Sequence, residues 1–266
     1  MNWGKMKTLF IYLFVALNAV LLTFYIYTVQ KNKTEIVQEK EIIERSMKND
    51  NITVEENATK RDNLGYVNVT ISDLKDIRKE DSGLKYEVEN VDKTSTLKVS
   101  SENVITNVNK GSYRAELDSF LLEKMKLSAN YIFSSYNSSK NEVIFEQQID
   151  SFRVFSNKNA RIVFSVENNG DIKNFTLTSV SNIRKDKNEA LVPSSQAINR
   201  LYHEDLIPKN CRVRTTLGYY TYISQTENQV LIPTWNVEIS DKDGQIRNYY
   251  VDAINLNVLN RKGHSP

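Results

Sequence analysis

The chain has 266 residues, of which 40% are hydrophobic and 26% are charged, and its formal net charge is +2. This apolar content is enough for a folded core, so the composition excludes a chain that is disordered throughout. The near-neutral charge argues against a nucleic-acid-binding protein, which usually needs a basic face to neutralise phosphates.

Residues Leu9 to Val29 form an apolar segment without a charged residue. A helix needs about 20 such residues to cross a bilayer, so we predict a transmembrane helix over residues 9–29. The apolar core of a cleaved signal peptide is shorter, about 7–15 residues, so we expect this segment to remain as an anchor. The very short N-terminal flank favours a cytoplasmic tail at 1–8 and a body outside the cytoplasm, in a single-pass protein of the cell membrane.

Small and polar residues recur along one stripe of this segment. Tyr12, Ala16, Ala19 and Thr23 follow helical spacing, and we expect Asn18 to lie beside them. Small residues let helices approach closely, and side-chain amides and hydroxyls can hydrogen-bond across an interface. These five residues are candidate contacts with a partner helix. The alternative is that alanine is simply apolar and one asparagine is tolerated.

The segment after the membrane is highly charged but keeps an apolar helical spacing through Ile36, Val37, Ile42, Ile43 and Met47. This spacing predicts that the helix continues to about Asp50, either to pair with a partner helix or to form a solvated stalk. Residues 51–63 are polar and are expected to be a linker. Residues 30–63 are therefore interpreted as a juxtamembrane helix and linker.

A short motif occurs twice in the rest of the chain. Residues 170–175 and 244–249 both read Gly-x-Ile-basic-Asn-aromatic, at an offset of 74 positions. The dipeptides Asn169-Gly170 and Asp243-Gly244 are typical of hairpin turns in which both central residues have positive φ. The same offset superimposes Val163 on Val237, so the motif indicates an internal repeat.

Each copy is predicted to begin with a helix that is followed by strands. The first helix is expected at about Ser112 to Met125 and the second shortly after Pro193, which is tolerated in a first turn. Their apolar faces comprise Leu117, Leu121, Leu122 and Met125, and Ala197, Ile198 and Leu201. The predicted strands are 129–136, 142–149, 161–166 and 172–180 in the first copy, and 212–223, 230–239, 246–253 and 256–259 in the second.

We therefore expect an α+β fold with two repeated extracytoplasmic modules, residues 64–182 and 183–266, each with one helix on an antiparallel β-sheet. Residues 66–71, 84–91 and 95–101 alternate like strands. We expect them to extend the sheet of the first module or to form its edge.

The sequence offers few residues for catalysis or metal binding. It contains two histidines, His203 and His264, and one cysteine, Cys211, which cannot form a thiolate cluster alone. Asp241–Gly244 begins like a calcium loop, but the closing glutamate is absent. No catalytic residue, cofactor or metal site is expected, so the chain is not expected to be an enzyme. The enzymatic alternative is a hydrolase with two carboxylates that converge in space.

Four aromatic residues, Tyr219, Tyr220, Trp235 and Tyr249, fall in strands that are expected to be neighbours. Packing in the core accounts for most of them. Any that stay exposed would form a protein-contact surface, because tyrosine and tryptophan are enriched at interfaces.

Both ends of the chain resemble the YycI (WalI) family. The resemblance lies in Met1-Asn2-Trp3, Lys7–Ile11, Asn18, Ala197–Tyr202, Leu217–Tyr220, Pro233–Val237 and Tyr249–Ala253. It implies a membrane protein of low-GC Gram-positive bacteria. Such a protein associates, largely through transmembrane helices, with its sister protein YycH and with the sensor histidine kinase of the WalK/WalR (YycG/YycF) system, which controls cell-wall metabolism. The resemblance supplies no catalytic residues. The alternative function is an envelope sensor that binds a wall fragment or peptide in a cleft between the modules.

Overall fold

The computed structural model describes residues 3–55, 61–75, 83–91, 94–125, 131–221 and 227–260, without the side chains of residues 3–5 and 29–40. The chain divides into two compact units, Met1–Thr53 and Val54–Pro266. The predicted side chains Ile36, Val37 and His264 therefore lie outside the described part of the protein.

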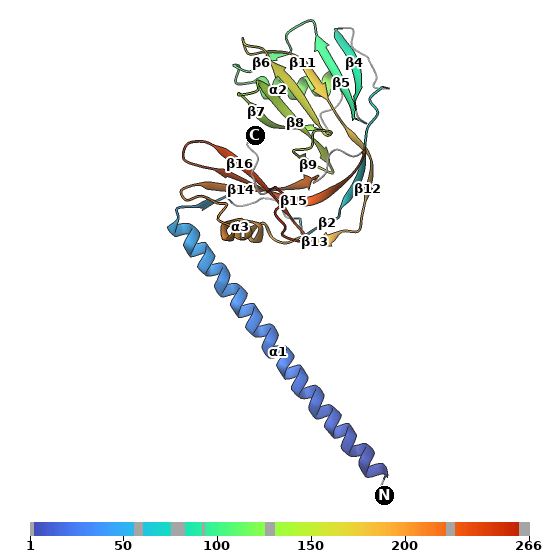
Figure 1. Ribbon diagram of the computed structural model, residues 1–266, viewed down its shortest axis with the longest axis vertical. Coiled ribbons are helices and arrows are strands. Elements are labelled where there is room, and N and C mark those ends of the chain that lie inside the picture. The colour runs from blue at the N-terminus through green and yellow to red at the C-terminus, as the bar shows by residue number, and fades with distance from the viewer. Residues whose placement is uncertain are drawn as a thin grey trace. The chain divides into compact units, whose positions relative to one another are not determined.

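The first unit is one long helix, α1 (Trp3–Asn49, 47 residues), drawn in blue in Figure 1. The predicted membrane helix and the predicted stalk are thus a single element. Residues Met6–Thr28 are long and apolar enough to cross a membrane once, and the side chains of residues 6–27 are exposed. The helix ends because Asn51 adopts a left-handed conformation (φ 59°). The Ile52 N–H then donates to the Met47 carbonyl oxygen and the Asn51 N–H to that of Lys48, as in a Schellman motif.

The second unit is an α+β structure, as predicted. Its described helices are α2 (Tyr113–Glu123) and α3 (Ser194–His203). The strands are β1 (Thr53–Val54), β2 (Asn63–Leu64), β3 (Val67–Ile71), β4 (Leu84–Val91), β5 (Thr94–Ser101), β6 (Thr106–Asn107), β7 (Tyr131–Asn137), β8 (Glu142–Ile149), β9 (Phe152–Phe155), β10 (Arg161–Val166), β11 (Asp171–Leu177), β12 (Val180–Lys185), β13 (Glu189–Ala190), β14 (Arg212–Tyr220), β15 (Asn228–Ser240) and β16 (Ile246–Asp252).

Fourteen described strands form one hydrogen-bonded sheet in the order β12-β3-β15-β14-β9-β8-β10-β11-β5-β4. Beside this path, β1 pairs with β14, β16 with β15, β6 with β11 and β7 with β8, while β13 and β2 form a separate pair. The sheet bends at β9, so that it has a first half (β4, β5, β7, β8, β10, β11) and a second half (β3, β12, β14, β15, β16) (Figure 1).

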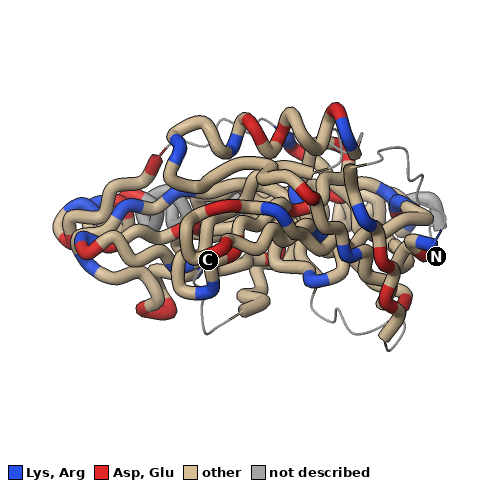
Figure 2. The backbone as a smooth tube through the Cα atoms, turned by 90° about the horizontal axis from the view of Figure 1, so that it is seen from above, with Lys and Arg blue, Asp and Glu red and all other residues tan. Residues whose placement is uncertain are grey.

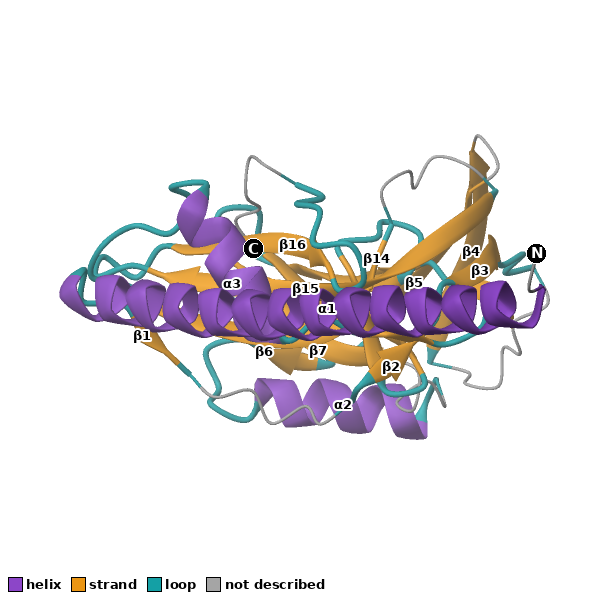
Figure 3. Cartoon of the chain, turned by 90° about the horizontal axis from the view of Figure 1, so that it is seen from below, coloured by secondary structure: helices purple, strands orange, loops and turns teal. Residues whose placement is uncertain are grey.

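The core of the first half lies between its sheet and α2, which contacts β6 and β7 (Figure 3). Alternate residues of the strands are buried there, as the period of 2 requires. The aromatic residues of this core are Phe145, Phe164 and Phe175, and Leu117 and Leu121 of α2 pack with them. The predicted apolar helix face is confirmed at these two leucines. It is wrong at Leu122, which is 57% exposed, because α2 turns that position towards solvent.

The second half buries its apolar residues on the side of α3, which contacts β15. Ala197, Ile198 and Leu201 form the buried face of α3, as predicted. Trp235 on β15 is buried, and its indole N–H donates to the carbonyl oxygen of Val192 at 2.8 Å, just before α3 begins. This bond fixes the start of the helix against the sheet.

The two predicted hairpins exist, but their turns differ from the prediction. Gly170 and Gly244 have positive φ (88° and 77°), whereas Asn169 and Asp243 do not. In both turns the glycine N–H donates to the carbonyl oxygen three residues earlier, Glu167 or Asp241. This is the pattern of a type I turn followed by glycine. The turn with two positive φ angles is instead Asp150-Ser151 (50° and 70°), between β8 and β9.

The structure does not confirm two separate repeated modules. Val67–Ile71 was expected in or beside the first module's sheet, but β3 pairs with β15 and β12 in the second half. The four-residue strand β9 pairs antiparallel with β8 and parallel with β14, so the expectation of purely antiparallel sheets is also wrong. Hydrogen bonds between distant segments decided this, because an alternating pattern does not say which strand is its neighbour.

A buried polar network supports the junction of the halves. The Asn157 side-chain amide donates to the Thr221 hydroxyl at 3.0 Å and to the Gln229 side-chain oxygen at 2.8 Å. Gln147 on β8 donates to the carbonyl oxygen of Val180 and accepts from its N–H, both at 2.9 Å. Buried polar side chains that are fully hydrogen-bonded specify a single arrangement, so we infer that the two halves are held at a defined angle.

Candidate functional site

The two halves of the sheet face each other across a cleft of about 510 Å³. Helices α2 and α3 each pack on the face of the sheet that points away from the cleft. The alternate strand residues that do not enter the two cores therefore line the cleft. On β8, Val143 and Phe145 are buried in the core, whereas Glu142, Ile144 and Glu146 face the cleft. The remaining lining residues are Ser134, Ser135, Asn137, Lys140, Arg153, Phe155, Ser156, Arg161, Asn236, Glu238, Ile246, Asn248 and Tyr250.

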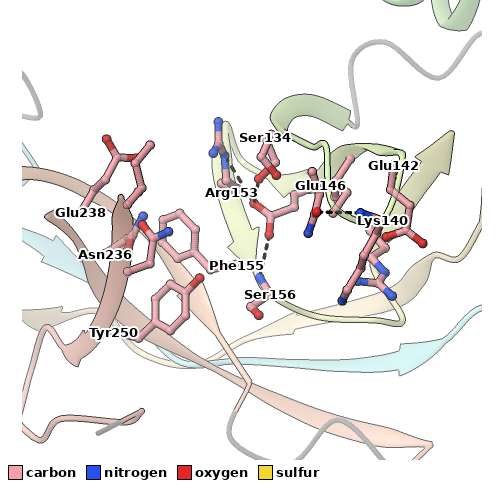
Figure 4. Close-up of a pocket in the computed structure, with 16 residues that line it drawn as sticks. Ser134, Lys140, Glu142, Glu146, Arg153, Phe155, Ser156, Asn236, Glu238 and Tyr250 are labelled. Carbon is pink, nitrogen blue, oxygen red and sulfur yellow. Dashed lines mark hydrogen bonds and ion pairs between the residues drawn. The ribbon is translucent and has the colours of Figure 1, made fainter. Parts of the chain in front are cut away.

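Glu146 is the one buried carboxylate among the lining residues, and hydrogen bonds hold both of its oxygens (Figure 4). Oε1 accepts from the Ser156 N–H at 2.7 Å, and Oε2 accepts from the Ser134 hydroxyl at 3.0 Å. The Arg153 Nε atom lies 3.7 Å from Oε2. Burial nevertheless raises the pKa of Glu146 above its ordinary value of 4.5, although Arg153 and the two hydrogen bonds act in the opposite direction.

This raised pKa makes the stability depend on pH. Because the folded state holds the Glu146 proton more tightly than the unfolded state, the stabilisation from Glu146 is greatest below the unfolded pKa and is lost as the pH rises through the folded pKa. Glutamine keeps the shape and an acceptor but cannot ionise. The free energy of unfolding of the wild type, minus that of Glu146→Gln, should therefore fall as the pH rises above the ordinary glutamate pKa of 4.5, as urea titrations at each pH would measure. A constant or rising difference would contradict this assignment.

Aromatic rings pack at the base of the cleft. The rings of Phe155 and Tyr250 have centroids 5.6 Å apart, and those of Tyr220 and Tyr250 are 4.6 Å apart, each pair at an interplanar angle of 23°. Burial raises the pKa of the Tyr250 hydroxyl, and nearby Glu146 adds to this effect. Tyr250 is thus held neutral as a packing and hydrogen-bonding group.

The second wall of the cleft carries two asparagines with unsatisfied oxygens. Asn236 on β15 and Asn248 on β16 point away from the α3 side of the sheet, and the Oδ1 atom of each is buried without a hydrogen-bond partner. Most buried polar atoms in proteins have a partner, so these two call for an explanation. Neither asparagine was a candidate in the sequence. The available signal was the run of polar residues at alternate strand positions, Asn236 with Glu238 and Asn248 with Tyr250.

The structure places three of the four candidate contact aromatics in the core. Tyr219, Trp235 and Tyr249 are buried, and only Tyr220 is half-buried. They cannot form the exposed patch that was considered from the sequence, because β14, β15 and β16 turn these positions inward. Cys211 is buried as well.

The five candidate residues of the membrane segment all lie on α1, but they do not share one face. Successive residues of an α-helix are about 100° apart, so Tyr12, Ala16, Ala19 and Thr23 form one stripe and Asn18 points to another side. The Asn18 amide donates to the Phe14 carbonyl oxygen, and the Thr23 hydroxyl donates to that of Ala19, each at 2.8 Å. The Thr23 hydroxyl was expected to donate a hydrogen bond to a partner helix, but it donates within α1 instead. Asn18 and Thr23 each keep a side-chain oxygen that can accept a hydrogen bond.

The described residues contain no group of three or more His, Cys, Asp or Glu side chains that could hold a metal ion. His203 lies at the end of α3. Asp241–Gly244 forms the turn between β15 and β16. Within the cleft, Glu142 and Glu238 are only half-buried, so no second buried acid accompanies Glu146.

Two solved structures have a similar course of the chain. An uncharacterized protein from Eubacterium rectale ATCC 33656 is 8% identical, with 79% of this chain and 90% of that chain covered and a TM-score of 0.45. The C-terminal domain of Bacillus megaterium YpeB is 11% identical, with 86% and 96% covered and a TM-score of 0.44. No curated protein matches the sequence.

The family comparison covers most of the chain. The profile of the YycI protein family matches residues 30–254, which include the second part of α1 and nearly all of the second unit. The apolar residues Met6–Thr28 precede this match and suit a single-pass membrane anchor. The chain therefore belongs to the YycI family of regulatory proteins, which act in the WalK (YycG) two-component system.

Proposed function

We propose that this protein is a membrane-anchored, non-enzymatic regulator that associates with a YycH-like sister protein and with a WalK-type sensor histidine kinase. Residues 1–8 lie in the cytoplasm, 9–29 in the membrane and the remainder outside it. Membership of the YycI family is the observation that carries this proposal. The exposed apolar helix supports it, because a segment of this length is stable in lipid, where it can meet the helices of other membrane proteins.

The two sides of α1 suit two different helix neighbours. The stripe of Tyr12, Ala16, Ala19 and Thr23 allows close packing, whereas Asn18 offers a polar acceptor about 100° away from Ala19. We assign the stripe to one partner and Asn18 to the other. In the outer part, Tyr220 is the one candidate aromatic that is left partly exposed for contact. The matching hairpins at Gly170 and Gly244 support an origin of residues 64–182 and 183–266 as repeated modules, although β3 now pairs within the second half of the sheet.

Replacing residues 9–29 by an unrelated transmembrane helix is expected to abolish the association. The kinase and the sister protein should be recovered at least about tenfold less when the protein is purified from membranes, because each 1.4 kcal/mol of lost helix contact weakens binding tenfold. Kinase autophosphorylation in reconstituted vesicles should then equal that of the kinase alone. Unchanged recovery and unchanged kinase output would refute the proposal.

Point variants test the two sides of the helix separately. Ala16→Ile with Ala19→Ile should lower recovery of one partner, and Asn18→Leu should lower recovery of the other, because bulky or apolar side chains remove close packing or the polar acceptor. The matched control is Leu13→Ile with Leu17→Ile, which preserves volume on the side of α1 that is about 90–140° away from both the stripe and Asn18, and it should change neither. If the two variants reduce both partners equally, the assignment of separate faces is wrong.

A further inference from the structure

Two arginines of the cleft lie beside a single buried carboxylate. Arg153 and Arg161 are half-buried there, and Glu146 is the only buried carboxylate beside them. Arg153 donates from Nη2 to the carbonyl oxygen of Phe133 at 3.0 Å and lies beside Glu146. The Arg161 guanidinium has no hydrogen bond or ion pair with any described residue, although it lies close enough to Glu146 to lower that carboxyl's pKa. The Arg161 guanidinium is thus available to a ligand.

A guanidinium that is partly removed from water and has no partner favours an anion. Its planar fork of N–H groups matches the two oxygens of a carboxylate. Lys140 lies at the exposed side of the same wall and adds a second cation (Figure 4). Glu146 does not compete for these cations fully, because both of its oxygens already accept hydrogen bonds from Ser156 and Ser134.

The facing wall supplies neutral hydrogen-bonding groups. The Oδ1 atoms of Asn236 and Asn248 have no hydrogen-bond partner among the described residues, and rotation of each terminal amide exchanges its oxygen and nitrogen. Each can therefore offer a donor or an acceptor to the cleft. A backbone amide group has one donor and one acceptor, so two such side chains match a short stretch of peptide backbone.

The carboxylates of the cleft favour a ligand that is anionic at one end only. Glu142 lies on the first wall and Glu238 on the second, where Arg214 is 3.9 Å from the Glu238 carboxylate. These carboxylates would repel a ligand that is anionic along its length, such as a polyphosphate chain. We propose that the cleft binds a short peptide through its free C-terminal carboxylate, which pairs with Arg161 and Arg153, while Asn236 and Asn248 hydrogen-bond its backbone.

Calorimetric titration of the full chain in detergent micelles tests this site. The probes are N-acetyl-trialanine with a free carboxylate, the same peptide with a C-terminal amide, and inorganic phosphate. The free acid should bind, and the amide should bind at least about tenfold more weakly because it lacks the ion pair with arginine. Absence of binding by the acid, or equal binding of acid and amide, would overturn the proposal. Phosphate that binds as tightly as the peptide would reduce the site to a simple anion site and would also overturn it.

Matched variants test the contribution of each wall of the cleft to peptide binding. Arg161→Gln should weaken binding of the free acid at least about tenfold and leave the amide unaffected, whereas Asn236→Ala with Asn248→Ala should weaken both peptides. Arg184→Gln, at an exposed arginine of β12 outside the cleft, is the control and should leave affinity unchanged. If Arg161→Gln binds the acid like the wild type, the site is wrong. The site does not depend on the membrane partners, so loss of association in the helix-replacement experiment would leave this result intact.

Discussion

Replacement of Gly218 by alanine is expected to lower the free energy of unfolding by about 3 kcal/mol, the upper end for an extra methyl group in a packed interior. A Cβ atom at this position would lie 2.4 Å from the carbonyl oxygen of Arg153 and 2.4 Å from the Phe155 ring. The obstacle includes backbone, which cannot move without breaking the parallel pairing of Gly218–Tyr220 with Arg153–Phe155. The substitution therefore destabilises the junction that joins the two halves of the sheet.

The measurement is urea unfolding of the full chain in detergent, followed by the fluorescence of Trp235 in a Trp3→Phe background, since the chain has two tryptophans. The control is Gly111→Ala, where a Cβ atom would meet nothing within 4 Å. That change should be neutral or stabilise the protein by up to about 1 kcal/mol through the unfolded state. Equal midpoints for the two alanine variants would show that the close approach of β9 to β14 is not required.

Replacement of Phe164 by alanine is expected to cost about 3–5 kcal/mol, as for other buried phenylalanines. Phe164 has no exposed surface, and its ring lies 5.6 Å from that of Phe145 and 4.9 Å from that of Phe175, measured between centroids. These three residues come from adjacent strands, β8, β10 and β11, so the cavity would open at the centre of the first half. Since domains are stable by only about 5–15 kcal/mol, this loss is a large fraction of the total stability, and we expect a measurable unfolded population of this variant at 37 °C.

The matched control for this substitution is Leu122→Ala. Leu122 is on α2 beside the same core but is 57% exposed, so its truncation should change the free energy of unfolding by no more than about 0.5 kcal/mol. The same urea titration compares the two variants. A loss for Phe164→Ala as small as that for Leu122→Ala would mean that the first half is not packed around the three phenylalanine rings.

The candidate site shows why function was harder to predict than the elements. Glu146 stands in an alternating strand, and the sequence alone places it on the face opposite Phe145. Nothing local indicates that Arg153 on the next strand, β9, and Asn248, about one hundred positions later, line the same cleft. Convergence of distant side chains depends on the angle between the sheet halves. That angle follows from β9 and from the hydrogen bonds of Asn157.

By itself, the sequence determined the features that depend on local physical chemistry. An uncharged apolar run of sufficient length specified the membrane helix, the period of 2 specified β8 and β10, and the glycines specified both hairpins. Only the tertiary structure decided that β3 crosses to the second half, that β9 joins the halves and that Tyr219, Trp235 and Tyr249 are buried. Periodicity reports which face of a strand is apolar, whereas the choice of neighbouring strand is made by packing and hydrogen bonds between segments far apart in the chain.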